Sequence, residues 1–298
     1  MSRPSGTGRL VALVLLVLLG LGGVAALVVE SQDAEHLAAR GRQALDDNDL
    51  PRAEARFRQA LARDPVQIGA LAGLGWTYLL AGEPEAAQAA FERCGELAPD
   101  QAECLRGQAS VDMAQGQPTK ARVLLVKALQ LAPDDPKVQS SMGLLELSDG
   151  DIAGGAARYE SLVARFPDDA EYHVGLVEAR LRQKRLVEAL SLVDRALALE
   201  DTPVRTVATL YLQRARVLVA SVADRADPQR CAETVPPLLA WLDAADHAVQ
   251  AAADTGVRLP TQGDVQRAVG RSRGMVQDAC PGFDPGEVVA APSPVAPE

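Results

Sequence analysis

The chain has 298 residues, of which 48% are hydrophobic and 3% aromatic, so it can bury a sizeable core and is not disordered throughout. Its apolar residues are mostly Ala, Leu and Val, which suits close-packed helices better than β-sandwiches and predicts an all-α fold. The formal charge is −10, and without Arg3 and Arg9 the remainder carries −12; we expect no nucleic-acid ligand, because an acidic body repels phosphate backbones.

A short tail, residues 1–9, precedes an apolar segment. Leu10–Val29 (residues 10–29) runs twenty residues without a charge. As a helix rising about 1.5 Å per residue, it spans the roughly 30 Å hydrocarbon core of a bilayer and predicts a transmembrane anchor. The alternative is a cleaved signal peptide, because Gly23-Val24-Ala25 is similar to a small-x-small cleavage site. We favour the anchor, since signal peptides carry only about 7 to 15 apolar residues.

Charges on either side of the segment predict its orientation. Arg3 and Arg9 precede it, whereas Glu30, Asp33 and Glu35 follow it. The positive-inside bias therefore leaves the N-terminus in the cytoplasm and exports the rest. Abundant Ala, Arg and Gly suggest a GC-rich bacterial genome, so the predicted location is the bacterial inner membrane, single-pass, with a periplasmic C-terminal region.

The region after the segment repeats itself. Pro65, Pro99, Pro133 and Pro167 recur every 34 residues. Each proline closes two amphipathic stretches, which predicts about five helix pairs over residues 34–202, starting near 34, 68, 102, 136 and 170. Small and aromatic residues recur in the same phase, among them Gly41, Ala53, Phe57, Ala60, Gly75, Tyr78, Gly82, Ala87, Phe91, Gly116, Ala121, Ala128, Gly143, Gly150, Tyr159, Ala189 and Ala196.

Small residues near the eighth, twentieth and twenty-seventh places, with proline at the thirty-second, resemble the tetratricopeptide repeat family. The resemblance implies an α-solenoid of helix-turn-helix repeats that binds proteins. Departures are Cys94 in place of a small Ala, Asp112 and Glu146 where Tyr78 is aromatic, and Val177 where Gly is expected.

Residues 203–280 stay helical in pattern, with stretches at Val204–Ala226, Pro237–Ala253 and Gln262–Ala279 but no period. We interpret them as a helical capping bundle after the solenoid, with a separate ligand-binding domain as the rival. Residues 281–298 are rich in Pro and Ala and predict a disordered tail.

Four cysteines form two candidate pairs. Cys94 and Cys104 lie ten residues apart around the turn at Pro99, and Cys231 and Cys280 bracket the capping region. Disulfides at both pairs suit the exported topology. The alternative is four buried thiols, and no spacing typical of a zinc site exists.

Signatures of chemistry are missing from the sequence. His36, His173 and His247 are dispersed, and the chain lacks metal-hydrolase, nucleophile-elbow and phosphate-loop motifs, so we expect no enzyme, no cofactor and no metal. A remote alternative is an enzyme in the capping region, whose candidate polar residues are Asp224, Asp227, Glu233, Asp243, Asp246 and His247.

The resemblance implies that the first helices of the repeats line a concave groove for an extended or helical segment of a partner. Trp76 is the predicted anchor point of this groove, with packing against the adjoining helix as the alternative. The projected lining residues are Trp76, Leu79, Leu80, Arg106, Met113, Lys137, Leu144, Leu181 and Arg182. The predicted function is a membrane-anchored scaffold or assembly factor in the cell envelope. A self-associating spacer, and hence a homo-oligomer, is the alternative.

Overall fold

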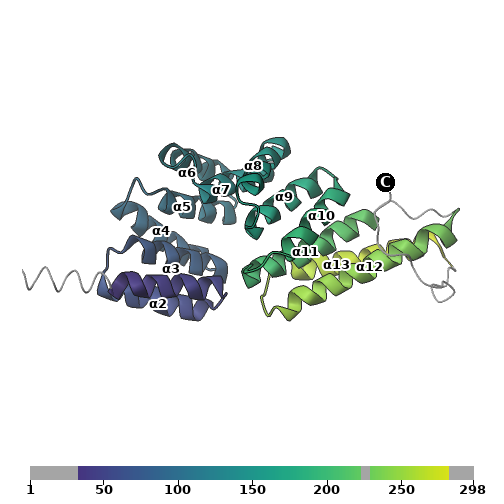
Figure 1. Ribbon diagram of the computed structural model, residues 1–298, viewed down its shortest axis with the longest axis horizontal. Helices are drawn as coiled ribbons and strands as arrows, with labels where there is room; N and C mark the ends of the chain where they lie inside the picture. Colours follow the sequence, from purple (N-terminus) through teal and green to yellow (C-terminus); the bar gives the residue numbers. More distant parts are fainter. Residues whose placement is uncertain (1–32, 223–228, 282–298) are drawn as a thin grey trace, which may run out of the picture. The chain divides into compact units, whose positions relative to one another are not determined.

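The structure, a computed structural model, describes residues 33–222 and 229–281, and every regular element in those ranges is an α-helix (Figure 1). The predicted anchor at residues 10–29 lies outside the described residues, as does nearly all of the predicted tail. Within the described ranges, no helix has the length and apolar character needed to cross a bilayer. A helix over residues 33–46 comes first, followed by α2 Leu50–Arg63, α3 Ile68–Ala81, α4 Pro84–Leu97, α5 Ala102–Ala114, α6 Pro118–Leu131, α7 Pro136–Ser148, α8 Ile152–Arg165, α9 Ala170–Arg182, α10 Leu186–Leu197, α11 Val204–Val222, α12 Cys231–Asp254 and α13 Gln262–Ala279.

These helices form pairs, and a single backbone conformation joins the two helices of each pair. One residue at every turn has positive φ, and in the first and fifth pairs it is Asn48 and Lys184 in place of glycine. A hydrogen bond closes each turn, as from Glu83 N to Tyr78 O at 2.9 Å, which is the six-to-one bond of a Schellman motif. The turn residues recur at the 34-residue period: Asn48, Gly82, Gly116, Gly150 and Lys184.

An aromatic side chain packs each second helix against two first helices in three of the repeats. The ring of Phe91, which is fully buried on α4, lies where a Cβ added to Gly75 or Gly107 would approach it to 2.7 or 2.1 Å. Glycine is therefore required by close approach at these two positions, where the aromatic ring fills the space between neighbouring helices. The same arrangement places Phe57 against Gly41 and Gly73, and Tyr159 against Gly143 and Gly175.

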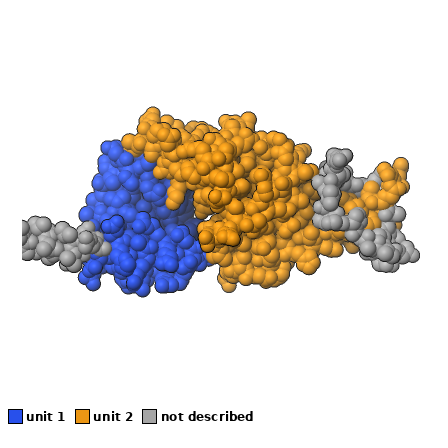
Figure 2. Space-filling view, viewed as in Figure 1, with its two compact units in different colours: residues 1–117 blue, residues 118–298 orange. Residues whose placement is uncertain are grey.

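The chain divides into two compact units, residues 1–117 and 118–298 (Figure 2). The described part of unit 1 runs from the helix of residues 33–46 to α5, and that of unit 2 from α6 to α13. Each unit is described by itself below.

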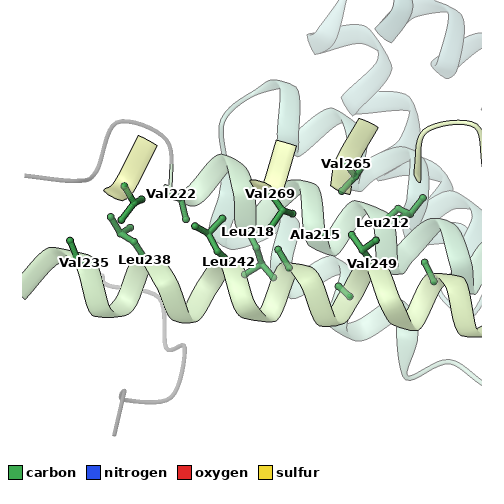
Figure 3. Close-up of a cluster of buried hydrophobic side chains, with 14 of the residues drawn as sticks. Leu212, Ala215, Leu218, Val222, Val235, Leu238, Leu242, Val249, Val265 and Val269 are labelled. Carbon is green, nitrogen blue, oxygen red and sulfur yellow. The ribbon is translucent and has the colours of Figure 1, made fainter. Parts of the chain in front are cut away.

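Helices α11, α12 and α13 occupy the part of unit 2 where the capping region is predicted. Leu218 of α11, Leu242 of α12 and Val269 of α13 point toward one another in a cluster of aliphatic side chains (Figure 3). Helix α12 begins at Cys231, so the predicted start at Pro237 was wrong. Pro236 and Pro237 lie inside α12, in its second turn, where each removes one backbone hydrogen bond to the residue four places earlier.

Both predicted cysteine pairs are disulfide-bonded, so the alternative of four buried thiols does not hold. Cys94 at the end of α4 joins Cys104 at the start of α5, with Cα atoms 5.6 Å apart. Cys231 at the start of α12 joins Cys280 directly after α13, with Cα atoms 5.7 Å apart.

Candidate protein-interaction surfaces

The ninth residue of each repeat marks the exposed side of the first helices. This position holds Trp76 on α3, Ser110 on α5, Leu144 on α7 and Glu178 on α9. Each is at least partly exposed. The predicted lining residues lie on these same helices and divide between the two units.

In unit 1 the indole of Trp76 is held by three neighbours. Its Nε1 donates to Glu103 Oε1 at 2.7 Å, and the Arg106 guanidinium lies 4.1 Å from the ring centroid. Phe91 meets the indole edge to face at 5.1 Å between centroids. We call Trp76, Phe91, Glu103 and Arg106 the Trp76 cluster. Trp76 therefore packs on adjoining helices and remains partly exposed, and its role as the anchor point of a groove stays a prediction.

Charge within the Trp76 cluster is balanced. Arg106 donates to Glu103 through Nη2 at 2.7 Å and Nε at 3.2 Å, and its side chain is only 13% exposed. Such a bidentate pair fixes the guanidinium over the indole. Because the cation is already neutralised, the cluster is suited to an apolar partner side chain more than to a free anion.

Three more of the predicted lining residues are apolar side chains on two of the helices of this cluster. Leu79, Leu80 and Met113 are half-buried, on the last turns of α3 and α5. Leu79 also packs against the buried residues around Phe91. Unit 1 thus carries five of the predicted lining residues: Trp76, Leu79 and Leu80 within the last two turns of α3, and Arg106 and Met113 two turns apart on α5.

Unit 2 carries the other four predicted residues, which have different environments. Lys137 is exposed in the first turn of α7, and Leu144, two turns further along the same helix face, is 49% exposed. Leu181 is partly buried and packs against the core. Arg182 donates to Glu178 Oε1 and to the Leu147 carbonyl, both at 2.8 Å.

Sequence reasoning missed three charged residues that form hydrogen bonds with the predicted lining residues or with their partners. Glu103 orders the Trp76 cluster, and Glu178 receives Arg182 and also Arg216 of α11. The repeat phase offered a signal for Glu178, which stands 102 residues after Trp76, or three periods. Arg216 lies beyond the last repeat, where no period identifies it.

The polar residues considered for chemistry have structural roles. Asp243 and Asp246 bind Arg273 at 2.9 and 2.8 Å, and His173 Nε2 lies 2.8 Å from the Pro167 carbonyl. Asp224 and Asp227 lie outside the described residues. Where the structure is described, it gathers no group of His, Cys, Asp and Glu side chains suited to a metal ion.

The geometry defines a class of protein: paired helices repeating every 34 residues, with an aromatic and a glycine contact between pairs. Family models described as tetratricopeptide repeat match residues 44–111 and 141–203, and the chain therefore carries tetratricopeptide repeats. Both models describe a repeat and neither describes an enzyme. Comparison with curated protein sequences found no match.

Solved structures share this fold. A tetratricopeptide repeat protein from Parabacteroides merdae is similar with a TM-score of 0.58 at 16% identity, over 80% of this chain and 84% of that one. The Cut9–Hcn1 hetero-tetramer of APC/C gives 0.56 at 16% identity, covering 81% and 45%. PilW, a type IV pilus biogenesis factor, gives 0.51 at 15% identity, covering 78% and 98%.

Proposed function

We propose that this chain is a membrane-anchored protein-interaction scaffold or assembly factor of the bacterial cell envelope. Its first helices bind a segment of another protein. The observation that carries the proposal is the Trp76 cluster, a partly exposed indole fixed by Glu103 and Arg106, on two helices that also carry half-buried leucine and methionine side chains. Aromatic and arginine side chains of this kind are the usual energetic centres of protein interfaces.

Preorganisation strengthens this argument. A partner that binds an indole already held by a hydrogen bond loses little side-chain entropy on the scaffold's side. PilW is a precedent for an assembly role on a similar fold. That precedent concerns the kind of role and names no partner for this chain.

Site-specific photo-crosslinking tests the surface directly. A photoreactive phenylalanine analogue at Met113 should form a covalent adduct with a partner in intact cells, whereas the same analogue at Leu97, exposed on second helix α4, should not. The double variant Trp76→Ala, Arg106→Ala should lower the Met113 adduct by about tenfold or more. Its matched control, Arg93→Ala with Leu97→Ala on α4, should leave the adduct unchanged.

The crosslink also separates the alternatives. Equal adducts at Met113 and Leu97 would overturn the proposed surface. An adduct between two copies of the chain, with no other protein, would favour the self-associating spacer. We keep circular dichroism of each variant as the check that folding is intact.

Anchoring and export complete the proposal. The charge-free Leu10–Val29 segment supports the anchor, and the two disulfides support an oxidising compartment such as the periplasm. Intact mass of the protein purified from membranes should include residues 1–29, and protease added to spheroplasts should digest the repeats. A mature chain beginning near Ala26 would replace the anchor by a cleaved signal peptide.

A further inference from the structure

A second surface, on the first helices α7 and α9 of unit 2 and on the adjoining helix α11, is built from charge. Glu178 of α9 accepts from Arg182 Nε at 2.8 Å and from Arg216 Nη1 at 2.7 Å. Each arginine side chain is 40% exposed, whereas that of Glu178 is 16% exposed. One carboxylate therefore serves two guanidinium groups, and the cluster carries one net positive charge at the surface of an acidic protein. We call Glu178, Arg182 and Arg216 the arginine pair and its carboxylate.

Both arginines retain hydrogen-bond donors. A guanidinium has five N–H donors. Arg182 uses Nε for Glu178 and Nη1 for the Leu147 carbonyl, and Arg216 uses Nη1 alone. Among the described residues, Nη2 of Arg182, together with Nη2 and Nε of Arg216, donates to no acceptor. An incoming carboxylate can accept from these groups without breaking the existing bonds.

The internal carboxylate keeps the arginines in place at neutral pH. Burial alone raises the pKa of Glu178, but the hydrogen bonds from Arg216 and Arg182 lower it further than burial raises it. Its pKa therefore lies below the usual glutamate range, and the side chain stays ionised. Oriented guanidinium groups bind a carboxylate with less ordering cost than free ones.

An apolar residue lies beside this charge. Leu144 of α7 is 49% exposed and stands one helical turn before Leu147, whose carbonyl holds Arg182. Leu144 and Glu178 also occupy the same place in successive repeats. A ligand for this surface therefore combines an anionic group with an adjacent apolar one.

We propose that the first-helix surface of unit 2 binds an acidic protein segment. Carboxylates of that segment accept from Arg182 and Arg216, while a neighbouring apolar side chain packs on Leu144. The inference rests on the proposed function and deepens it by naming the chemical class of partner. Acidic segments are favoured over uniformly charged polyanions, because the −10 charge of the chain repels a polyanion along its whole length.

A pair of synthetic peptides tests the charge requirement. The probe is a fluorescein-labelled dodecapeptide of four Glu-Leu-Gly triplets, compared with its Gln-Leu-Gly counterpart by fluorescence anisotropy on the full chain in detergent. The Glu peptide should bind more tightly, with an affinity that falls as salt rises. Arg182→Gln with Arg216→Gln should weaken it by about tenfold. The matched control is Arg195→Gln with Arg271→Gln, two exposed arginines on α10 and α13, which should change the affinity less than twofold.

A second variant guards against misfolding as the cause. Leu144→Ser leaves both arginine residues in the sequence. It should weaken binding of the Glu-Leu-Gly peptide by about threefold while leaving binding of a Glu-Ser-Gly peptide unaffected. Equal binding of the Glu and Gln peptides, or no loss in the arginine variant, overturns the inference. Stronger binding to phosphatidylglycerol vesicles than to the peptide overturns it in favour of a lipid. If the peptide experiment overturns the inference but the Met113 crosslink is retained, the proposed function stands without this partner class. If the Met113 crosslink is absent as well, the proposed function is overturned too.

Discussion

The repeats and the capping helices bury their side chains in different ways. In repeats one, two and four an aromatic ring lies between two glycines that are spaced by the 34-residue period. In α11–α13 the buried cluster consists of Ala, Val and Leu with Cys280, and no glycine contact recurs among its members (Figure 3). Periodic packing ties each ring to two fixed backbone positions, whereas the capping cluster distributes its contacts over three long helices.

Repeats three and five show that the aromatic and the glycines change together. Leu125 and Val193 stand where Phe91 stands in repeat two. The corresponding glycine positions hold Ala109 and Ser141 around repeat three, and Val177 and Thr209 around repeat five. Larger residues at the glycine positions thus accompany a smaller side chain on the second helix, so side-chain volume is redistributed among the three positions.

The largest expected effect comes from the disulfides, one of which lies in each region. Cys231 and Cys280 close 49 residues of sequence and Cys94 and Cys104 close 10. By loop-closure entropy, alanine at both positions should lower the free energy of unfolding by about 4 kcal/mol for the capping pair and about 3 kcal/mol for the repeat pair. Urea unfolding followed by Trp241 fluorescence in a Trp76→Phe background reports on the capping helices. Unfolding followed by Trp76 fluorescence in a Trp241→Phe background reports on the repeats.

Equal losses of unfolding free energy for the two pairs would contradict the dependence on loop length. They would show that the unfolded chain without a disulfide retains structure around each cysteine pair. A loss reported by both tryptophans for each pair would show that repeats and capping helices unfold as one cooperative unit. Either result would weaken the contrast between the two regions.

Placing the residues of repeat three in repeat two tests whether the aromatic residue and the two glycines depend on one another. Gly107→Ser places a side chain 2.1 Å from the Phe91 ring and should cost about 3 kcal/mol, because Phe91 is fully buried and cannot move aside. The triple variant Gly75→Ala, Phe91→Leu, Gly107→Ser gives repeat two the residues of repeat three. Its loss should be smaller than that of Gly107→Ser alone, measured by urea unfolding as a mutant cycle.

Additive losses in that cycle would mean that the glycine substitutions and Phe91→Leu act independently. An exchange of volume between these positions would then not explain why repeat three has an aliphatic residue in place of the ring. The control Gly270→Ala changes a glycine of α13 with no neighbour near the added Cβ, and it should leave stability unchanged or slightly raised.

Much of this fold was predictable from the sequence, and the reason is its period. Proline, glycine and aromatic residues at fixed places identify helix pairs because each has a physical role that repeats, as the turn residues from Asn48 to Lys184 show. The start of α12 was missed because Pro236 and Pro237 indicate a helix boundary to local reasoning. The charged partners of the surfaces were missed because Glu103 and Arg216 act through tertiary contacts across helices, which no spacing along the chain records.

The smallest of the expected effects distinguishes the repeats by pH. Tyr159 of repeat four is buried and donates to the Ser140 carbonyl at 2.8 Å, and burial raises its pKa to about 12 from the usual value near 10. A raised pKa in the folded state means that the folded chain keeps this proton while the unfolded chain loses it. The stabilisation is therefore complete below pH 10 and is lost as pH rises toward 12, by about 2 kcal/mol at pH 11.5.

Tyr159→Phe separates this titration from other alkaline effects. The variant lacks the ionisable group, so its free energy of unfolding should fall less steeply than that of the parent between about pH 10 and 12, when both are measured by urea unfolding. Parallel curves would show that the phenol is reached by water in the folded state. The Tyr159 ring would then be less enclosed by Gly143 and Gly175 than their close approach implies.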